Sequence, residues 1–164
     1  MPIEKQIKRH FTATGFIIER NNTLLHWHRK IQAWLPPGGH IIENEDPVQA
    51  VIREIYEETG IEVSIVGNQI KSNFKYPKRI FSPMAILIED IHDPDIGYHQ
   101  HIDLIYACKP KHEILTLSDK WLWISKDMLM SNQSLGLNNE QFLPPPDDVR
   151  ELALEAFEIV TSKN

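Results

Sequence analysis

Three glutamates, Glu54, Glu57 and Glu58, are spaced as neighbours on one face of an α-helix. Because successive helical residues turn by about 100°, the three side chains fall within a single arc, on the side away from Val48 and Ile55. Carboxylates at these spacings repel one another, and the C-terminal half of a helix disfavours anions. A bound divalent cation would relieve both costs, since carboxylate oxygens are the ligands that Mg²⁺ prefers. For such a helix taken by itself, the alternative is a solvated acidic surface.

The segment that carries these glutamates is predicted to be a helix over residues 47–59. Asp46 is a good N-cap, Pro47 suits the first helical position, and Gln49 completes a capping box. An apolar stripe follows at the helical period and predicts the buried face; it consists of Val48, Val51, Ile52 and Ile55. Gly60 is the expected end of the helix.

A proline- and glycine-rich segment, residues 35–39, lies just upstream of the helix. Two prolines remove backbone donors, and Gly38 and Gly39 permit positive φ, so the segment is predicted to be a shaped loop rather than a regular element. The alternative of a solvated acidic helix does not explain why such a loop precedes the helix.

From Gly39 to Ile61 the sequence reads GHIIENEDPVQAVIREIYEETGI. This stretch resembles the Nudix box, a pattern of fixed residues at fixed spacing, and every fixed position is filled: Gly39, Glu45, Arg53, Glu54, Ile55, Glu57, Glu58, Gly60 and Ile61. One departure lies between the fixed positions, where Ile42 stands at a place that is glutamate in many members of the family.

The resemblance implies an enzyme that hydrolyses a phosphoanhydride in a nucleoside diphosphate linked to another group, with Mg²⁺ or Mn²⁺. It implies that four groups hold the metal, namely the carboxylates of Glu54, Glu57 and Glu58 and the backbone carbonyl of Gly38. It further implies that Arg53 orients glutamates by bidentate pairing, with Glu45 as a partner.

The resemblance leaves the general base open, because members of the family differ. Glu54 is the first choice for the residue that takes a proton from the attacking water. The alternatives are downstream carboxylates, namely Asp103, with Glu89, Asp90 and Asp93 competing for the same role.

Substrate selection is expected to depend on residues outside the box. A basic run with neighbouring aromatics is one candidate for gripping phosphates and stacking a base; its members are Lys71, Phe74, Lys75, Tyr76, Lys78 and Arg79. A solvated loop is the alternative. Arg29 and Trp34, which lead into the glycine segment, are a second candidate lining, whereas Trp27 is predicted to belong to the core.

A separate pattern places His99, His101 and Asp103 on one face of a predicted strand. This spacing is capable of binding a transition metal, and a polar strand surface is the alternative.

The chain as a whole is predicted to be a single α/β domain over residues 1–164. Strands are expected at residues 11–19, 24–28, 61–66, 84–88, 102–108 and 121–124, with a C-terminal helix capped by Asp147 or Asp148 after three prolines. These elements predict a mixed sheet with helices packed on it, and the resemblance implies the Nudix-type α/β/α sandwich. With 41% hydrophobic and 24% charged residues, the composition excludes a disordered chain.

Charge and cysteine content limit the partners. The net charge of −6 argues against a polynucleotide partner, and a lone cysteine, Cys108, excludes a disulfide scaffold. Neither a signal peptide nor a membrane span is expected, so a cytoplasmic location is predicted.

The expected partner is a small nucleotide substrate, and homodimers are common in the family that the chain resembles. The alternative function is a Nudix domain that senses a nucleotide without cleaving it, although such domains typically lose box glutamates.

Overall fold

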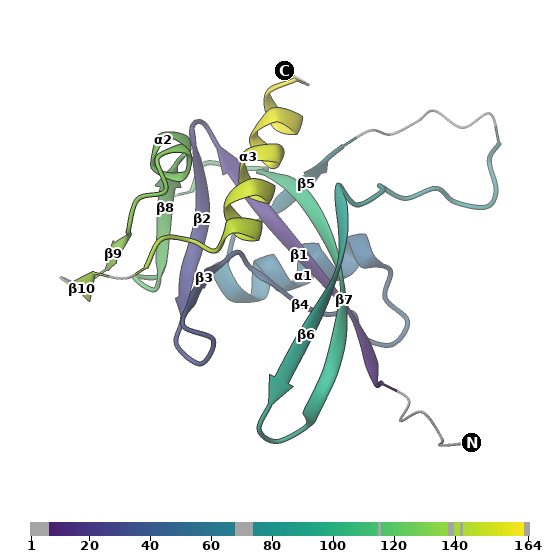
Figure 1. Cartoon of the computed structure of the whole chain (residues 1–164). Helices are drawn as coiled ribbons and strands as arrows, with labels where there is room; N and C mark the ends of the chain where they lie inside the picture. Colours follow the sequence, from purple (N-terminus) through teal and green to yellow (C-terminus); the bar gives the residue numbers. More distant parts are fainter. Residues whose placement is uncertain (1–6, 68–73, 115, 138–139, 142, 163–164) are drawn as a thin grey trace.

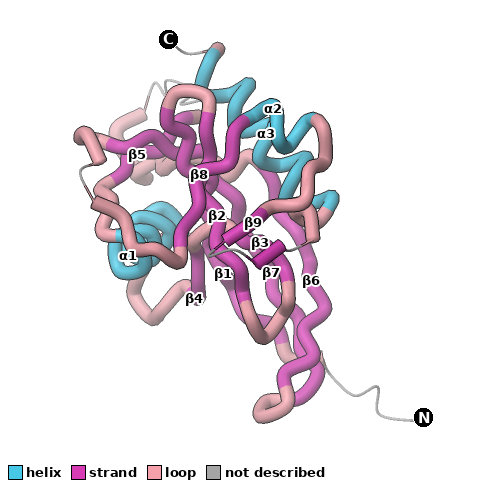
Figure 2. Tube along the Cα trace, turned by 90° about the vertical axis from the view of Figure 1, so that its left-hand side faces the viewer, coloured by secondary structure: helices cyan, strands magenta, loops and turns pink. Residues whose placement is uncertain are grey.

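The computed structural model describes residues 7–67, 74–114, 116–137, 140–141 and 143–162. A β-sheet forms the middle layer, with one helix on one face and a second helix on the other (Figures 1 and 2). This arrangement confirms the predicted α/β/α sandwich with a mixed sheet. Within the described residues, no helix is both long and apolar enough to cross a membrane.

The elements follow one another in the order β1 (Arg9–Glu19), β2 (Asn22–His28), β3 (Ala33–Leu35), β4 (Gly38–His40), α1 (Pro47–Thr59), β5 (Val63–Val66), β6 (Ala85–Asp93), β7 (Gly97–Pro110), β8 (Trp121–Ser125), α2 (Lys126–Met130), β9 (Gly136–Leu137), β10 (Glu140–Gln141) and α3 (Asp147–Thr161). The predicted strands are all present. Most of them are longer than predicted, and β5 is shorter, because residues 61–62 precede the ladder.

The main sheet has the path β3-β2-β1-β7-β5, with β4 also paired to β1, β6 to β7 and β8 to β2. The central strands β1 and β7 run parallel and are in register from Arg9↔Gln100 to Ile17↔Cys108. The other pairings are antiparallel, so the sheet is mixed. The central pair therefore brings together residues about 90 positions apart in the sequence.

Alternation along β1 and β7 divides the core into two clusters, one on each face. Ala13, Ile17 and Tyr106 pack with α1, whereas Phe16 and Ile105 pack with α3. Helix α1 is the predicted helix. The Asp46–Gln49 capping box is present, and Gly60 ends the helix in the left-handed conformation at φ 74°.

Two predictions about local structure are wrong. Gly38 and Gly39 are part of a short strand that pairs with β1, because glycine fits where the neighbouring chain leaves no room for a Cβ atom. At α3 the N-cap is Pro146, and Asp147 and Asp148 lie in the first helical turn without a capping bond. There their charges are favourable, because the first turn of a helix attracts anions.

Candidate active site

Helix α1 and strand β4 come into close contact at Glu54 and Gly39. A Cβ atom added to Gly39 would lie 2.5–2.7 Å from the carboxyl atoms of Glu54. The side chain of Glu54 therefore lies directly against the backbone of the strand, with only 17% of its surface exposed. The box-opening glycine provides the space that this carboxylate occupies.

Glu58 is partly buried and faces the backbone of β4. One carboxylate oxygen, Oε2, accepts a hydrogen bond from the backbone N–H of Gly38 at 3.2 Å. Burial raises the pKa of Glu58, and the charges of Glu54 and Glu57 act in the same direction, while the Gly38 N–H and Lys120 oppose them. A cation at this position would stabilise the charged form, since an opposite charge lowers the pKa of a carboxyl group.

Arg53 links the glutamates on the loop and on the helix. Its Nε and Nη2 donate to the two oxygens of Glu45 at 2.8 and 2.9 Å, which is the bidentate pairing implied by the family resemblance. Nη1 donates to Glu54 at 2.7 Å and to Glu57 at 3.0 Å, and Nη2 also donates to the carbonyl of His40 at 3.1 Å. The bonds to Glu45 and Glu54 raise the pKa of Arg53, and the bond to Arg53 lowers the pKa of Glu45.

The donor set fits a hard divalent cation. Arg53 engages Glu54 through Oε1 and Glu57 through Oε2, so it holds each carboxylate by one oxygen. Carboxylate and carbonyl oxygens suit Mg²⁺ and Mn²⁺ better than softer metals. Glu54 lies against Gly39, Glu58 accepts from the backbone N–H of Gly38, and Arg53 connects Glu57 to Glu54.

Asp103 lies on β7, on the sheet face that carries α3. It is 5% exposed, and its two carboxylate oxygens accept hydrogen bonds from the hydroxyls of Thr12 at 2.9 Å and Thr14 at 2.7 Å. Burial raises the pKa of Asp103, and the two hydroxyls oppose that shift. Thr12 and Thr14 lie 91 and 89 positions from Asp103 in the chain, so residue spacing does not predict them as its partners.

Glu89 and Asp93, the other two downstream carboxylates, lie in opposite electrostatic environments. Burial, together with the charges of Asp103 and Asp148, raises the pKa of Glu89 to about 7. Asp93 lies at the end of β6, where a hydrogen bond from Lys30 at 2.8 Å holds its pKa at about 2. Glu89 therefore has the proton affinity that suits a general base near neutral pH, and Asp93 does not.

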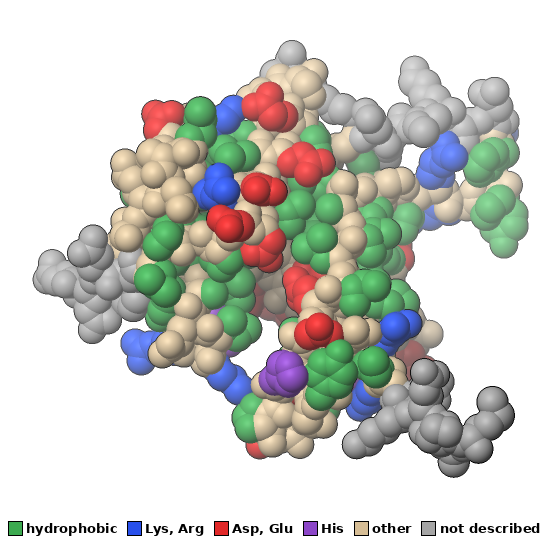
Figure 3. Space-filling model, viewed as in Figure 1, with side chains coloured by type: hydrophobic (Ala, Val, Ile, Leu, Met, Phe, Trp, Pro, Cys, Tyr) green, Lys and Arg blue, Asp and Glu red, His purple; other side chains and the backbone are tan. Residues whose placement is uncertain are grey.

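The face that carries α3 is acidic. Asp and Glu side chains run down the middle of this face, and a hollow opens below the N-terminal end of α3, beside β6 (Figure 3). An anionic substrate would reach this face only with its charge neutralised by cations.

The structure separates the predicted substrate-binding residues. Arg29 is exposed in the turn after β2, and Lys75, Tyr76 and Arg79 are exposed in residues 74–84, a segment before β6 that runs out from the body of the molecule (Figure 1). Lys71 lies outside the described residues. Trp34 is fully buried in the core, with its Nε1 donating to the carbonyl of Leu143 at 3.0 Å, so this placement gives no support to a substrate-binding role. Trp27 packs against the core, as predicted.

The family model for the NUDIX domain matches residues 8–144, which is most of the chain. The chain belongs to the Nudix family. The matched region contains β4, α1 and the strand pair β1–β7, and with them Glu45, the three helix glutamates and Asp103.

Proteins with curated names share part of this region. An RNA pyrophosphohydrolase of Acinetobacter baylyi is 33% identical over 68% of this chain and 70% of its own length. One from Psychromonas ingrahamii is 29% identical over 68% of this chain, and an 8-oxo-dGTP diphosphatase of Proteus vulgaris is 36% identical over 35%. The matched region spans 65% and 55% of the lengths of these last two proteins.

Solved structures also resemble this Nudix chain. A Nudix-family hydrolase from Clostridium perfringens is 29% identical, with a TM-score of 0.75 over 94% of this chain and 99% of the other. A MutT protein from Methanosarcina mazei, at 13% identity and a TM-score of 0.58, covers 97% of this chain and 99% of its own, and shows the same fold.

Proposed function

We propose that this Nudix protein is a Mg²⁺-dependent hydrolase that cleaves the pyrophosphate bond of a nucleoside diphosphate linked to another moiety. Glu54, Glu57, Glu58 and the carbonyl of Gly38 would hold the metal, with Mn²⁺ as a substitute for Mg²⁺. The observation that carries the proposal is the contact of Glu54 with Gly39, where a side chain would displace the carboxylate.

Bound Mg²⁺ would neutralise the pyrophosphate oxygens and lower the pKa of a metal-bound water. The residues of the chain have separate tasks. Arg53 holds Glu54 and Glu57 in fixed orientations through its donors, and Glu45 fixes Arg53 in turn. Glu54 is the first choice to take the proton of the attacking water, since it lies against β4 beside the other ligands. Glu89 is the alternative, because its pKa of about 7 suits proton transfer.

The substrate is proposed as a class only. The curated relatives are named for RNA and for 8-oxo-dGTP, so both a free nucleotide and the 5′ end of an RNA belong among the substrates to be tested. The small nucleotide is favoured by the net charge of −6, which gives little attraction for a long phosphate chain. A cytoplasmic location and a homodimer remain predictions.

The test is a screen for cleavage of the pyrophosphate bond, read from the phosphorylated products, over nucleoside triphosphates, 8-oxo-dGTP, ADP-ribose, dinucleoside polyphosphates, nucleotide sugars and a 5′-triphosphorylated RNA. We expect turnover on at least one substrate with Mg²⁺ and none after chelation. In Glu57→Gln, turnover should fall on the order of 100-fold or more, because a metal ligand is lost. The fold should persist, since the Glu57 side chain is 58% exposed.

The matched control is Glu62→Gln, which changes an exposed glutamate just beyond α1 whose carboxylate lies 3.9 Å from the ammonium of Lys111. Its turnover should equal that of the unmodified protein. A Glu57→Gln variant with an unimpaired rate would contradict the metal assignment. Binding of nucleotides without cleavage of any of them would favour the sensing function instead.

A further inference from the structure

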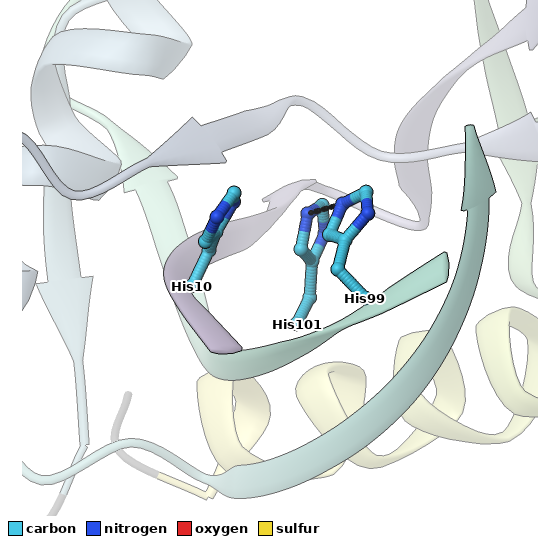
Figure 4. Close-up of side chains that lie close together, drawn as sticks. All are labelled: His10, His99 and His101. Carbon is cyan, nitrogen blue, oxygen red and sulfur yellow. Dashed lines mark hydrogen bonds between the residues drawn. The ribbon is translucent and has the colours of Figure 1, made fainter. Parts of the chain in front are cut away.

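Four histidines gather where the first residues of β1 and β7 meet the end of β4. His10 lies on β1, His40 on β4, and His99 and His101 on β7. The pairing of β1 with β7 places His10 directly opposite His101, and the pairing of β1 with β4 places His40 opposite Thr12. Figure 4 shows the rings of His10, His99 and His101 projecting from the same side of the two strands.

The nitrogen atoms of three of these rings lie within reach of a single ion. One ring nitrogen from each of His10, His99 and His101 lies within 4.8 Å of the other two. Nε2 of His99 and Nε2 of His101 are 3.2 Å apart. Tetrahedral zinc with Zn–N bonds of about 2.0–2.1 Å separates its ligand nitrogens by roughly 3.3–3.4 Å. The His99–His101 pair therefore already has the required spacing, and the longer gap to His10 is short enough for rotation of that side chain to close.

The ring of His99 is oriented for this purpose by the backbone. His99 is 3% exposed, and its Nδ1 lies 3.0 Å from the carbonyl oxygen of Gly97. A carbonyl oxygen only accepts, so Nδ1 carries the proton and, in the neutral ring, Nε2 presents its lone pair toward His101 (Figure 4). A histidine that ligates a metal commonly donates its other N–H to a carbonyl in this way.

The side chains of the cluster are ligands of a kind that transition metals prefer. Burial and the neighbouring imidazoles of His40, His99 and His10 lower the pKa of His101 to about 4. A neutral imidazole competes with no proton for the metal, and it offers no positive charge to a phosphate. Imidazole nitrogens favour Zn²⁺, Ni²⁺ and Cu²⁺, whereas the glutamates of α1 favour Mg²⁺ and Mn²⁺. The two groups of donors therefore select different ions.

We propose that His10, His99 and His101 form a second metal site, which binds a transition-metal ion of the Zn²⁺ type. His40 stands next to the fourth position, because its Nε2 lies 3.3 Å from Nδ1 of His10 and its ring centroid 4.9 Å from that of His101. The backbone carbonyl of His40 accepts a hydrogen bond from Arg53 at 3.1 Å. An ion in this cluster would therefore join the ends of three strands beside the residue that orients the glutamates.

The test is a calorimetric titration of the full chain, prepared without a histidine tag, with Zn²⁺ in excess Mg²⁺ so that the glutamate site is already filled. We expect one Zn²⁺ ion per chain and a Zn²⁺-dependent rise in the melting temperature. His10→Gln and His101→Gln should each weaken the binding at least tenfold and abolish the rise, with an unchanged circular dichroism spectrum. His10 lies near the exposed start of β1, so its variant keeps the test valid if His101→Gln fails to fold.

Two controls separate this site from other Zn²⁺ ligands. His112→Gln, which changes an exposed histidine outside the cluster, should bind Zn²⁺ like the unmodified protein. Glu57→Gln should also keep the Zn²⁺ site even where it loses Mg²⁺-dependent turnover, so failure of the proposed function would not remove this one. Absence of binding, undiminished binding in both cluster variants, or loss of Zn²⁺ in Glu57→Gln would each overturn the proposal.

Discussion

Arg53 is the side chain on which the geometry of the glutamates depends most. Its three nitrogens donate to Glu45, Glu54, Glu57 and the carbonyl of His40. A guanidinium can do this because its donors lie in a rigid plane, whereas an ammonium offers three donors from a single atom. The charge of Arg53 alone is therefore insufficient to hold these groups in place.

Replacement of Arg53 by lysine tests this distinction. We expect Arg53→Lys to lower metal-dependent turnover and Mn²⁺ affinity by about 10–100-fold, because the bidentate pairing and the second carboxylate contact cannot both survive. Turnover and Mn²⁺ titration measure the two effects. The control is Arg150→Lys on α3, whose guanidinium lies 3.4 Å from Asp147 and 3.7 Å from Glu151, two exposed carboxylates outside the glutamate site. Equal turnover in Arg53→Lys and Arg150→Lys would show that charge is sufficient.

The box residues of this site could be predicted from the sequence, because they are close together in the chain and their spacing is fixed by one helix. The partners of Asp103 could not, since Thr12 and Thr14 are 91 and 89 positions away. The same holds for His10, which meets His101 only because β1 and β7 run parallel in one register. A single sequence shows which residue types are present, but it does not show that β1 and β7 pair in this register.

At the level of elements, α1 was predictable at both ends and β4 was not. Asp46, Gln49 and Gly60 act within one turn of their own chain, so local chemistry determines where α1 begins and ends. Strand β4 exists because β1 lies alongside it, whereas the two prolines before it and its own two glycines favour a loop. The contact between α1 and β4 therefore depends on a strand pairing that the local sequence does not predict.

Gly39→Ala places a methyl group at that contact. The nearest atoms, 2.5–2.7 Å away, belong to the end of a flexible side chain, so Glu54 should move aside at little cost in stability. We expect turnover to fall about tenfold or more, because a displaced ligand weakens the metal site, while the free energy of unfolding changes by less than about 1 kcal/mol. Steady-state turnover and urea denaturation measure these effects.

Gly67→Ala is the matched control, since an added Cβ there would meet its nearest neighbour, Phe81, at an ordinary 3.6 Å. It should leave turnover unchanged. A Gly39→Ala variant with full activity would show that the close approach of β4 to Glu54 has no bearing on the site. A large loss of stability would instead assign Gly39 a role in packing.

Across the whole molecule, the fold class could be predicted from the alternation of strands with two amphipathic helices. The division of the core between the two faces of the sheet could not, because it depends on which strands are neighbours. The same division places His26 on the α1 side of β2, where its ring lies 4.6 Å from that of Trp121, and Nε1 of Trp121 donates to the carbonyl of Glu58 at 3.2 Å. The imidazole of His26 thus packs against the indole that donates a hydrogen bond to the last turn of α1.

This position of His26 should make the stability of the whole fold depend on pH. Burial, followed by the charges of His28 and Lys120, lowers the pKa of His26 from 6.5 to about 4. The unfolded chain therefore binds a proton more readily than the folded one, so the contribution of His26 is complete above pH 6.5 and is lost as the pH falls toward 4. Because the ring is partly exposed, we expect a loss of about 1–2 kcal/mol between neutral pH and pH ~5.

Urea denaturation of the unmodified protein and of His26→Gln at both pH values isolates this effect from that of Glu89, whose raised pKa acts in the opposite direction. A glutamine cannot take up the proton, so the difference in free energy of unfolding between the two proteins should shrink by about 1–2 kcal/mol on acidification. For His112→Gln, which alters an exposed ring, the corresponding difference should stay constant. A difference for His26→Gln that is the same at both pH values would mean that the ring titrates alike in the folded and unfolded chain, and that its contact with Trp121 does not exclude water.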